Sequence, residues 1–361
     1  MTSDAFVGRR HPIRRFLVCA MQGHFPVLAR DRQGELAVVF RTGAAHYGLP
    51  GTLATSWSGD GQAWSDPIEV APRWDDVRNP AFGIDGDGRW VLAYWKASVH
   101  AYPPTATGDE RRWRLPGPDP ARDRPDLFVV TSVDRGRSWS APSPYASPRL
   151  GFASPYGRIV HGPDGALVMA AYGTPRDAAA GRFDAVMVRS HDHGRTWGEE
   201  RLVAEHGSEL ALAWLAADHL VGAVRTTAGA TAIVASRDAG ATWTAPTVVT
   251  GAGEHPADLC ALADGRLLLT FGRRRRPLGC GALVSADGGV SWDRDREVIL
   301  AGDGIGNDVG YPSTVQRDDG TIVTVVYFAR GCAASEPAEG WGEVSCQALH
   351  YRADLFDLAG R

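Results

Sequence analysis

The 361-residue sequence lacks an apolar run long enough to cross a membrane, and it shows no secretory signal. Residues 1–16 carry several arginines but no apolar core of roughly 7 to 15 residues, which such a signal requires. The formal net charge is only −4, and the basic run at residues 273–276 does not by itself predict nucleic-acid binding. We therefore expect a cytoplasmic protein with neither a nucleic acid nor a membrane as its partner.

Cysteine and helical periodicity are also scarce. The five cysteines are Cys19, Cys260, Cys280, Cys332 and Cys346, and they show neither a CxxC motif nor a zinc-ligand spacing. We expect buried free thiols, although Cys260 and Cys280 could be neighbours, and we expect no metal or other cofactor. No long window has a period of 3.6 residues, which argues against a helical fold.

The sequence does contain a repeat, Ser-x-Asp-x-Gly-x-Ser/Thr-Trp, which recurs about every 50 residues. Intact copies occupy residues 132–139, 190–197, 236–243 and 285–292, and a degraded copy occupies residues 56–64. Each intact copy follows a short run of strand-forming residues, which predicts a hairpin turn. In this turn the Asp accepts backbone N–H groups, the Gly adopts a positive φ and the Trp covers a strand. We therefore expect these aspartates, and the neighbouring His191 and His193, to be structural.

A second repeat, a tight turn followed by an apolar run, alternates with the first. Its six copies lie at residues 32–39, 87–92, 164–168, 217–221, 264–268 and 319–323. Together the two repeats predict four-stranded antiparallel units, and six of them predict an all-β, six-bladed β-propeller in a single domain over residues 1–361. Strands at residues 13–20 and 345–351 are expected to pair and close the ring.

Candidate functional residues gather at the end of the predicted ring opposite the Asp-motif turns. The innermost strands begin there with His24, Arg78, Tyr156, Glu209 and Asp308, and the second strands end there with Arg41, Arg225 and residues 273–276. Several cations around one axis predict an anionic ligand, such as a carboxylated sugar. The alternative is that single arginines pair with Glu209, Asp258 or Asp308 in ordinary ion networks.

The Asp-motif repeats, together with Glu209, Arg225 and the segment 311–320, resemble the sialidase (neuraminidase) superfamily. Its members are six-bladed propellers that mostly act as exo-glycosidases. The resemblance implies that Tyr311 is the nucleophile, that Glu209 is its partner and that Arg225 binds the substrate carboxylate. It also implies a further arginine from the fifth blade, for which the candidates are Arg273 and Arg276.

Two positions depart from that family. His24-Phe25-Pro26 stands where the family has Arg-Ile-Pro, and residues 41–47 contain no carboxylate where the family has its acid/base Asp. The candidates for proton transfer are therefore His46, and Asp75 or Asp76 from the next loop. A histidine with an unperturbed pKa near 6.5 can serve as an acid and a base at neutral pH. His24, Arg41, Arg78, Asp308 and Tyr156 complete the expected substrate-binding set.

Three functions remain open at this point. The first is a glycoside hydrolase acting on an acidic or modified sugar, with Tyr311 and Glu209 as the nucleophile couple. The second is a lyase or a biosynthetic tailoring enzyme on the same ring, which uses His24, His46 and Tyr311 in proton transfer. The third is a propeller that binds a glycan without catalysis.

Overall fold

The computed structural model describes residues 13–20, 22–44, 46, 51–70, 76–97, 127–178, 182–330 and 343–357. Regular structure in these ranges is almost all β-strand, and the two helical segments are the short 3₁₀ turns η3 (Arg294–Arg296) and η4 (Ala353–Asp357). No helix in the same ranges is long and apolar enough to span a membrane. Cys332 and Asp75 lie outside the described residues.

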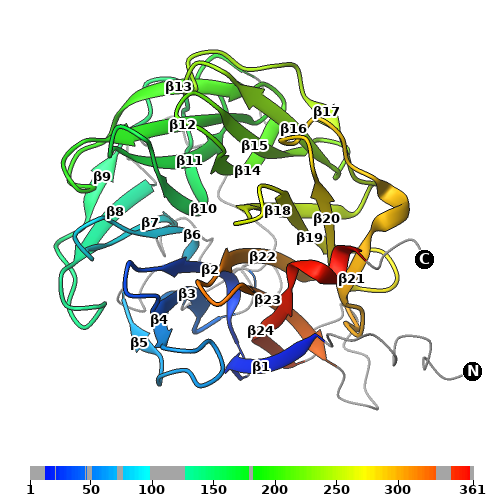
Figure 1. The fold of residues 1–361 in the computed structure, drawn as a ribbon. Helices are drawn as coiled ribbons and strands as arrows, with labels where there is room; N and C mark the ends of the chain where they lie inside the picture. Colours follow the sequence, from blue (N-terminus) through cyan, green and yellow to red (C-terminus); the bar gives the residue numbers. More distant parts are fainter. Residues whose placement is uncertain are drawn as a thin grey trace, which may run out of the picture.

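Four separate four-stranded sheets stand like propeller blades around a central axis (Figure 1). The first contains β2 (His24–Arg30), β3 (Leu36–Thr42), β4 (Thr52–Ser58) and β5 (Ile68–Glu69). The second contains β14 (Gly207–Trp214), β15 (Leu220–Thr226), β16 (Thr231–Ser236) and β17 (Thr247–Val248). The third contains β18 (Glu254–Ala261), β19 (Leu267–Arg273), β20 (Gly279–Ser285) and β21 (Val298–Ala301). The fourth contains β22 (Val309–Gln316), β23 (Thr321–Arg330), β24 (Glu343–Arg352) and β1 (Arg14–Cys19).

The remaining eight strands form one continuous sheet instead of two separate blades. One half contains β6 (Asp76–Ile84), β7 (Trp90–Ala97), β8 (Leu127–Ser132) and β9 (Ser143–Tyr145). The other half contains β10 (Ser154–His161), β11 (Leu167–Gly173), β12 (Asp184–Ser190) and β13 (Gly198–Ala204). Strands β6 and β10 join the halves by parallel pairing. Gly83 permits this approach, because a Cβ there would lie only 2.5 Å from the Ile159 carbonyl oxygen.

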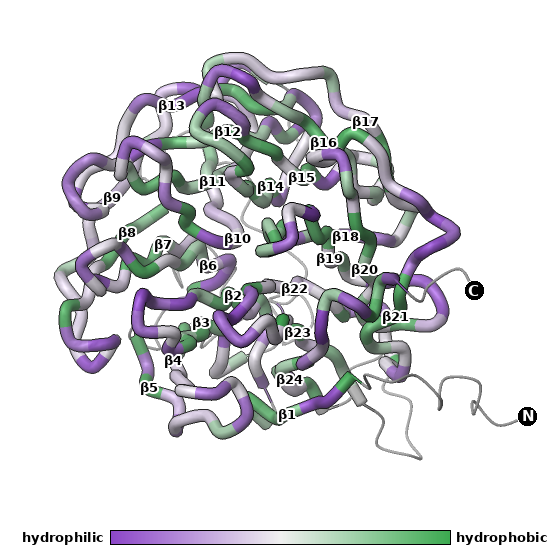
Figure 2. Tube along the Cα trace, in the orientation of Figure 1, coloured by the Kyte–Doolittle hydropathy of each residue, from purple (hydrophilic) through white to green (hydrophobic). Residues whose placement is uncertain are grey.

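The innermost strands β2, β6, β10, β14, β18 and β22 contact one another in a closed cycle around the axis. Hydrophobic residues follow the strands and hydrophilic residues follow the connecting loops (Figure 2). Between neighbouring sheets the buried side chains interlock, as where Val27 and Val39 pack with Phe82 and Leu92. The strands therefore form a rigid ring, and every innermost strand begins at the same end of its axis.

The ring closes through strands that are far apart in the sequence. Strand β1 pairs antiparallel with β24, with Arg14 opposite His350 and Cys19 opposite Cys346. The sequence predicted this pairing, and its physical benefit is that β1 covers the outer edge of β24. The fourth sheet is therefore held by backbone hydrogen bonds between the two most distant strands of the described chain.

The Asp-motif turns have the hydrogen bonds that the sequence predicted. In the last copy, Asp287 Oδ1 accepts the Ser291 N–H at 2.9 Å and Asp287 Oδ2 accepts the Ser291 hydroxyl at 2.6 Å. The Trp292 indole donates to the Gly289 carbonyl at 3.0 Å. The hydrogen bonds of Ser291 and Ser285 lower the pKa of Asp287 to about 2. Each such aspartate is thus engaged within its own turn, as a structural residue would be.

Candidate active site

Each innermost strand contains a bulge near its start. The pairing with the second strand shifts register between His24 and Val27 in β2, between Ser208 and Ala211 in β14 and between Gly310 and Ser313 in β22, with equivalent shifts in β6, β10 and β18. At these bulges, four residues other than glycine adopt a left-handed backbone: Phe25 (φ 53°), Asn79 (φ 51°), Glu209 (φ 42°) and Tyr311 (φ 51°). Positive φ values cost free energy in residues other than glycine, and they concentrate at functional sites. A bulge can also redirect a side chain, here toward the axis.

Tyr311 and Glu209 meet at the axis and share a hydrogen bond. The Tyr311 hydroxyl donates to Glu209 Oε1 at 2.5 Å, and Arg225 Nη1 donates to Glu209 Oε2 at 2.8 Å. Tyr311 and Glu209 are buried, with 7% and 3% exposure, whereas the Arg225 side chain remains 32% exposed. Three residues from β14, β15 and β22 thus form one connected hydrogen-bonded group.

The protonation states of this group follow from its surroundings. Burial, and then the negative charge of Glu209, raise the pKa of Tyr311 well above its usual value. Burial alone would raise the pKa of Glu209, but the Arg225 charge and the hydrogen bonds from Tyr311 and Arg225 lower it below its usual value. At neutral pH the phenol therefore keeps its proton and the carboxylate is ionised, which suits a nucleophile beside its base.

Arg274 is the residue of the basic run that reaches this group. Its guanidinium carbon lies 5.7 Å from the centre of the Tyr311 ring. Its Nε and Nη2 atoms are buried and have no hydrogen-bond partner among the described residues. Arg274 therefore brings an unpaired positive charge to the site.

The two arginines that the sequence proposed from this run are placed elsewhere. Arg273 is buried and pairs with Glu297 and, at 3.1 Å, with Glu254. Arg276 has an exposed side chain, and its backbone carbonyl accepts a hydrogen bond from Arg273. Neither Arg273 nor Arg276 is thus found beside Tyr311, whereas Arg274 is, and the expected role of Arg273 or Arg276 in substrate binding stays a prediction.

His46 is held beside Tyr311 by Asp308. Its Nδ1 lies 2.8 Å from Asp308 Oδ1, and the same oxygen accepts the Tyr327 hydroxyl at 2.6 Å. The imidazole centre is 6.3 Å from the centre of the Tyr311 ring. Burial alone would raise the pKa of Asp308, but the charge and hydrogen bond of His46 lower it well below its usual value. Asp308 is thus an anion that orients an imidazole in the candidate site.

His24 is also near Asp308, but it is a neutral histidine. Its Nε2 lies 3.9 Å from Asp308 Oδ2, and its side chain is 3% exposed. Burial lowers the pKa of His24 to about 3, although the Asp308 charge opposes this shift. At the position where the family has a positively charged arginine, this site therefore has the uncharged imidazole of His24.

Asp76 belongs to a buried ion cluster. Its carboxylate is fully buried and pairs with Arg41 at 2.7 Å and with Arg78 at 3.3 Å. Its two oxygens face one arginine each, and the expected acid/base role of Asp76 stays a prediction. Arg41 is also fully buried, whereas the Arg78 guanidinium stacks on Trp95, with its central carbon 4.3 Å from the ring centre.

Tyr156 lies against the site without offering a free hydroxyl. Its ring centre is 6.1 Å from that of Tyr311, and its hydroxyl donates to the Ala257 carbonyl at 3.1 Å. Tyr156 therefore packs against Tyr311, and its expected role in substrate binding stays a prediction.

The site opens into a cavity of about 380 Å³. Its polar wall includes His46, Arg78, Asn79, Glu209, Arg225 and Tyr311, and its aromatic wall includes Trp95, Phe152, Tyr172 and Phe183. The sequence analysis missed Asn79, which donates to Tyr172 at 3.1 Å. The available signal was the repeated residue-Pro pair, because Phe25-Pro26, Asn79-Pro80 and Tyr311-Pro312 occupy equivalent bulges.

Comparison with known proteins gives a family and a fold. A family model described as BNR repeat-like domain matches residues 115–324. No curated protein matches the sequence.

Solved structures share the architecture. A protein of unknown function from Dyadobacter fermentans is similar at 21% identity and a TM-score of 0.73, over 94% of this chain and 99% of that one. A Hadza microbial sialidase is similar at 21% identity and a TM-score of 0.68, over 93% and 66% of the two chains. The NanB sialidase from Streptococcus pneumoniae is similar at 15% identity and a TM-score of 0.64, over 94% and 69%.

Proposed function

Because the chain belongs to the BNR repeat-like domain family and shares its fold with sialidases, we propose that it is an exo-acting glycoside hydrolase for an acidic or modified sugar. The observation that carries this proposal is the hydrogen-bonded group of Tyr311, Glu209 and Arg225 at the wall of a cavity. A phenol with an ionised carboxylate at 2.5 Å is a nucleophile with its base in reach.

We interpret the ring as six-bladed and as one domain over residues 1–361. The eight-stranded sheet counts as two blades, because each half has its own innermost strand, β6 or β10, at the axis. This interpretation is supported by the closed cycle of innermost strands. In this interpretation the substrate enters through one opening, which is bordered by the starts of the innermost strands.

In the proposed first step, the Tyr311 oxygen bonds to the anomeric carbon while the bond from that carbon to the leaving oxygen breaks. The phenolic proton passes to Glu209 Oε1, and His46 donates a proton to the leaving oxygen. Water then attacks the anomeric carbon and gives its proton to His46, while Tyr311 departs and recovers its proton from Glu209. Two displacements at one carbon retain its configuration.

A tyrosine nucleophile suits an acidic sugar. A carboxylate nucleophile would be repelled by the negative charge of such a substrate, whereas the Tyr311 phenol is neutral until it attacks. Arg225 and Arg274 supply two positive charges beside Tyr311, and they can hold the acidic group and orient the ring. His24 occupies the position of the arginine in the family's Arg-Ile-Pro, but it is neutral. In this proposal, therefore, only two arginines bind the acidic group of the substrate.

The test is hydrolysis of aryl α-glycosides, with a sialoside beside uronides and neutral sugars. We expect wild-type protein to release the phenol from an acidic glycoside, and Tyr311→Phe and His46→Ala to lose turnover by about a hundredfold or more. Tyr145→Phe is the matched control, because Tyr145 also donates to a glutamate, Glu200 at 2.8 Å, but on an outer strand.

The outcomes separate the proposed function from its alternatives. Turnover that survives Tyr311→Phe would refute the nucleophile assignment. A lyase is the second candidate, because His46 lies near Tyr311 and a second imidazole, His24, lies near His46. An unsaturated product absorbing in the ultraviolet would identify it. Binding of a glycoside without turnover would indicate a glycan-binding propeller.

A further inference from the structure

A second, larger cavity lies at the other end of the axis, and its volume is about 650 Å³. The candidate active site lies at the starts of the innermost strands, whereas this distal cavity is lined by their ends. All six innermost strands contribute, for example through Arg30, Ile84, Arg158, Trp214, Ala261 and Gln316. Its volume is in the range of pockets that hold small molecules.

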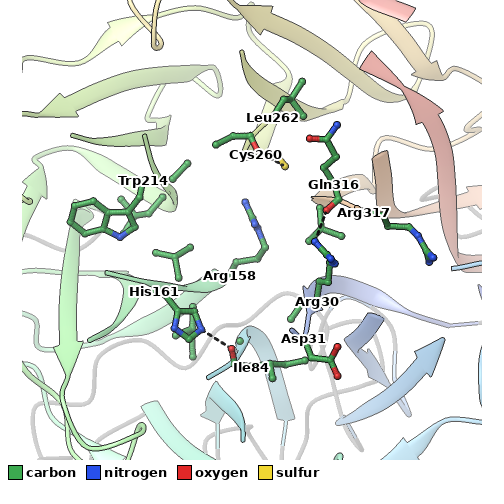
Figure 3. Close-up of a pocket in the computed structure, with 18 of the residues that line it drawn as sticks. Arg30, Asp31, Ile84, Arg158, His161, Trp214, Cys260, Leu262, Gln316 and Arg317 are labelled. Carbon is green, nitrogen blue, oxygen red and sulfur yellow. Dashed lines mark hydrogen bonds between the residues drawn. The ribbon is translucent and has the colours of Figure 1, made fainter. Parts of the chain in front are cut away.

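Arg158 is the central charged group of the distal cavity (Figure 3). Its Nε pairs with Asp258 at 3.2 Å, and its Nη2 donates to the Leu259 carbonyl. In the described part of the chain, Nη1 has no hydrogen-bond partner, and the side chain retains 17% exposure. The guanidinium is therefore fixed on one side and presents a donor to the cavity on the other.

Further donors around this cavity lack acceptors. The Trp214 indole nitrogen and Arg30 Nε are buried and have no hydrogen-bond partner among the described residues. In Figure 3 the indole nitrogen of Trp214 is on the side of its ring that faces the cavity. His161 is held nearby, because its Nε2 lies 2.6 Å from the Ile84 carbonyl oxygen.

The two acidic residues of the lining, Asp31 and Asp318, already accept hydrogen bonds. Asp31 Oδ1 accepts the backbone N–H groups of Gln33 at 3.0 Å and Glu35 at 2.8 Å. Asp318 accepts a hydrogen bond from Arg30. The distal cavity thus offers a surplus of donors, and an entering ligand must supply acceptors and negative charge.

We propose that the distal cavity is a second ligand site, and that it binds a small oxyanion, the carboxylate or phosphate group of a small molecule. Arg158 Nη1 contacts the anion, and a slight rearrangement of Trp214 and Arg30 lets their unpaired donors complete the contact. This site is separate from the candidate active site, because the two cavities share no lining residue. Phe25, Tyr311 and Pro312 border a further void of only about 10 Å³.

The test is calorimetric titration of the purified protein with inorganic phosphate, citrate or glucose at constant ionic strength. We expect one site for phosphate or citrate and none for neutral glucose, and the two anions distinguish phosphate from carboxylate recognition. Arg158→Lys, which keeps the charge opposite Asp258, should weaken binding by about tenfold or more. Ala261→Trp, at an exposed position of the lining, should block binding by filling the cavity.

Two control variants distinguish binding in the distal cavity from a general effect of charge and from binding at the candidate active site. Arg317→Gln removes a charge from the lining but should leave binding unchanged, because the Arg317 guanidinium is turned away to the Gly59 carbonyl at 3.0 Å. Arg225→Gln, at the other mouth, should also leave it unchanged. The proposal is overturned if neither anion binds, if Ala261→Trp binds as well as wild type, or if Arg225→Gln abolishes the signal.

Discussion

The contact between Tyr311 and Glu209 can be measured without knowing the substrate, by a double-mutant cycle on stability. Tyr311→Phe removes only the hydroxyl, and the ring keeps its packing on Phe25, whose centre is 4.7 Å away. Glu209 Oε1 then remains buried without its donor, at a cost of about 1.5–3 kcal/mol. Glu209→Leu removes both carboxylate oxygens, so the Tyr311 hydroxyl loses its acceptor. The loss of the charge opposite Arg225 costs less, because the Arg225 side chain is 32% exposed.

The coupling energy separates this contact from the other effects of each change. A double variant no longer leaves one partner unmet, so we expect the two single losses to exceed the double loss by about 1.5–3 kcal/mol. The assay is equilibrium unfolding in urea, with the free energy of unfolding compared across the four proteins. A parallel cycle on Tyr145 and Glu200 is the matched control, because the same groups meet at 2.8 Å with a half-buried glutamate.

The control should give a smaller coupling of about 0.5–1 kcal/mol, because water screens its carboxylate. A coupling below about 0.5 kcal/mol for Tyr311 and Glu209 would refute the buried charge-assisted hydrogen bond. The nucleophile couple would then lose its physical basis, whatever the activity of the protein.

Three further predictions concern neighbouring groups. Lowering the pH from about 6.5 to 4 should reduce the unfolding free energy of wild type more than that of His24→Asn. The reason is that folded His24, with a pKa of about 3, stays neutral while the unfolded chain takes up a proton. Arg274→Gln should raise KM for an acidic glycoside without lowering thermal stability, whereas Arg273→Gln should lower stability by about 3 kcal/mol, since it breaks a buried ion cluster. Asp308→Asn should slow a glycoside with a poor leaving group by about a hundredfold, and an activated aryl glycoside less, because His46 loses the group that orients it.

The parts of the fold that repeat were predictable from the sequence. The Asp motif specifies its own turn through local hydrogen bonds, so Asp287 and Trp292 could be assigned without tertiary information. The joining of β6 to β10 was not predictable in this way. It depends on how closely two innermost strands approach at Gly83, and no local pattern reports that distance.

A residue of the candidate site could be identified from the sequence where it is the only one of its type at a strand end. The choice was ambiguous where several residues of one type are adjacent. Glu209 and Tyr311 are each flanked by residues of other types, whereas Arg273 and Arg274 are adjacent and chemically identical. Successive residues point in opposite directions near a strand end, so a shift of one position decides between an ion cluster and the axis. The burial of Asp76 between Arg41 and Arg78 was not predictable for a similar reason, since it depends on long-range packing.

The pairing of β1 with β24 also delays closure of the ring during synthesis of the chain. Residues 20–342 separate these two strands, and at about 5–20 residues per second a ribosome needs roughly 15–65 s to make that segment. During this interval β1 has no partner strand, and the partly made ring of sheets is not yet closed. An open strand edge can pair with another chain, so we expect the nascent chain to be most prone to aggregation before β24 has been made.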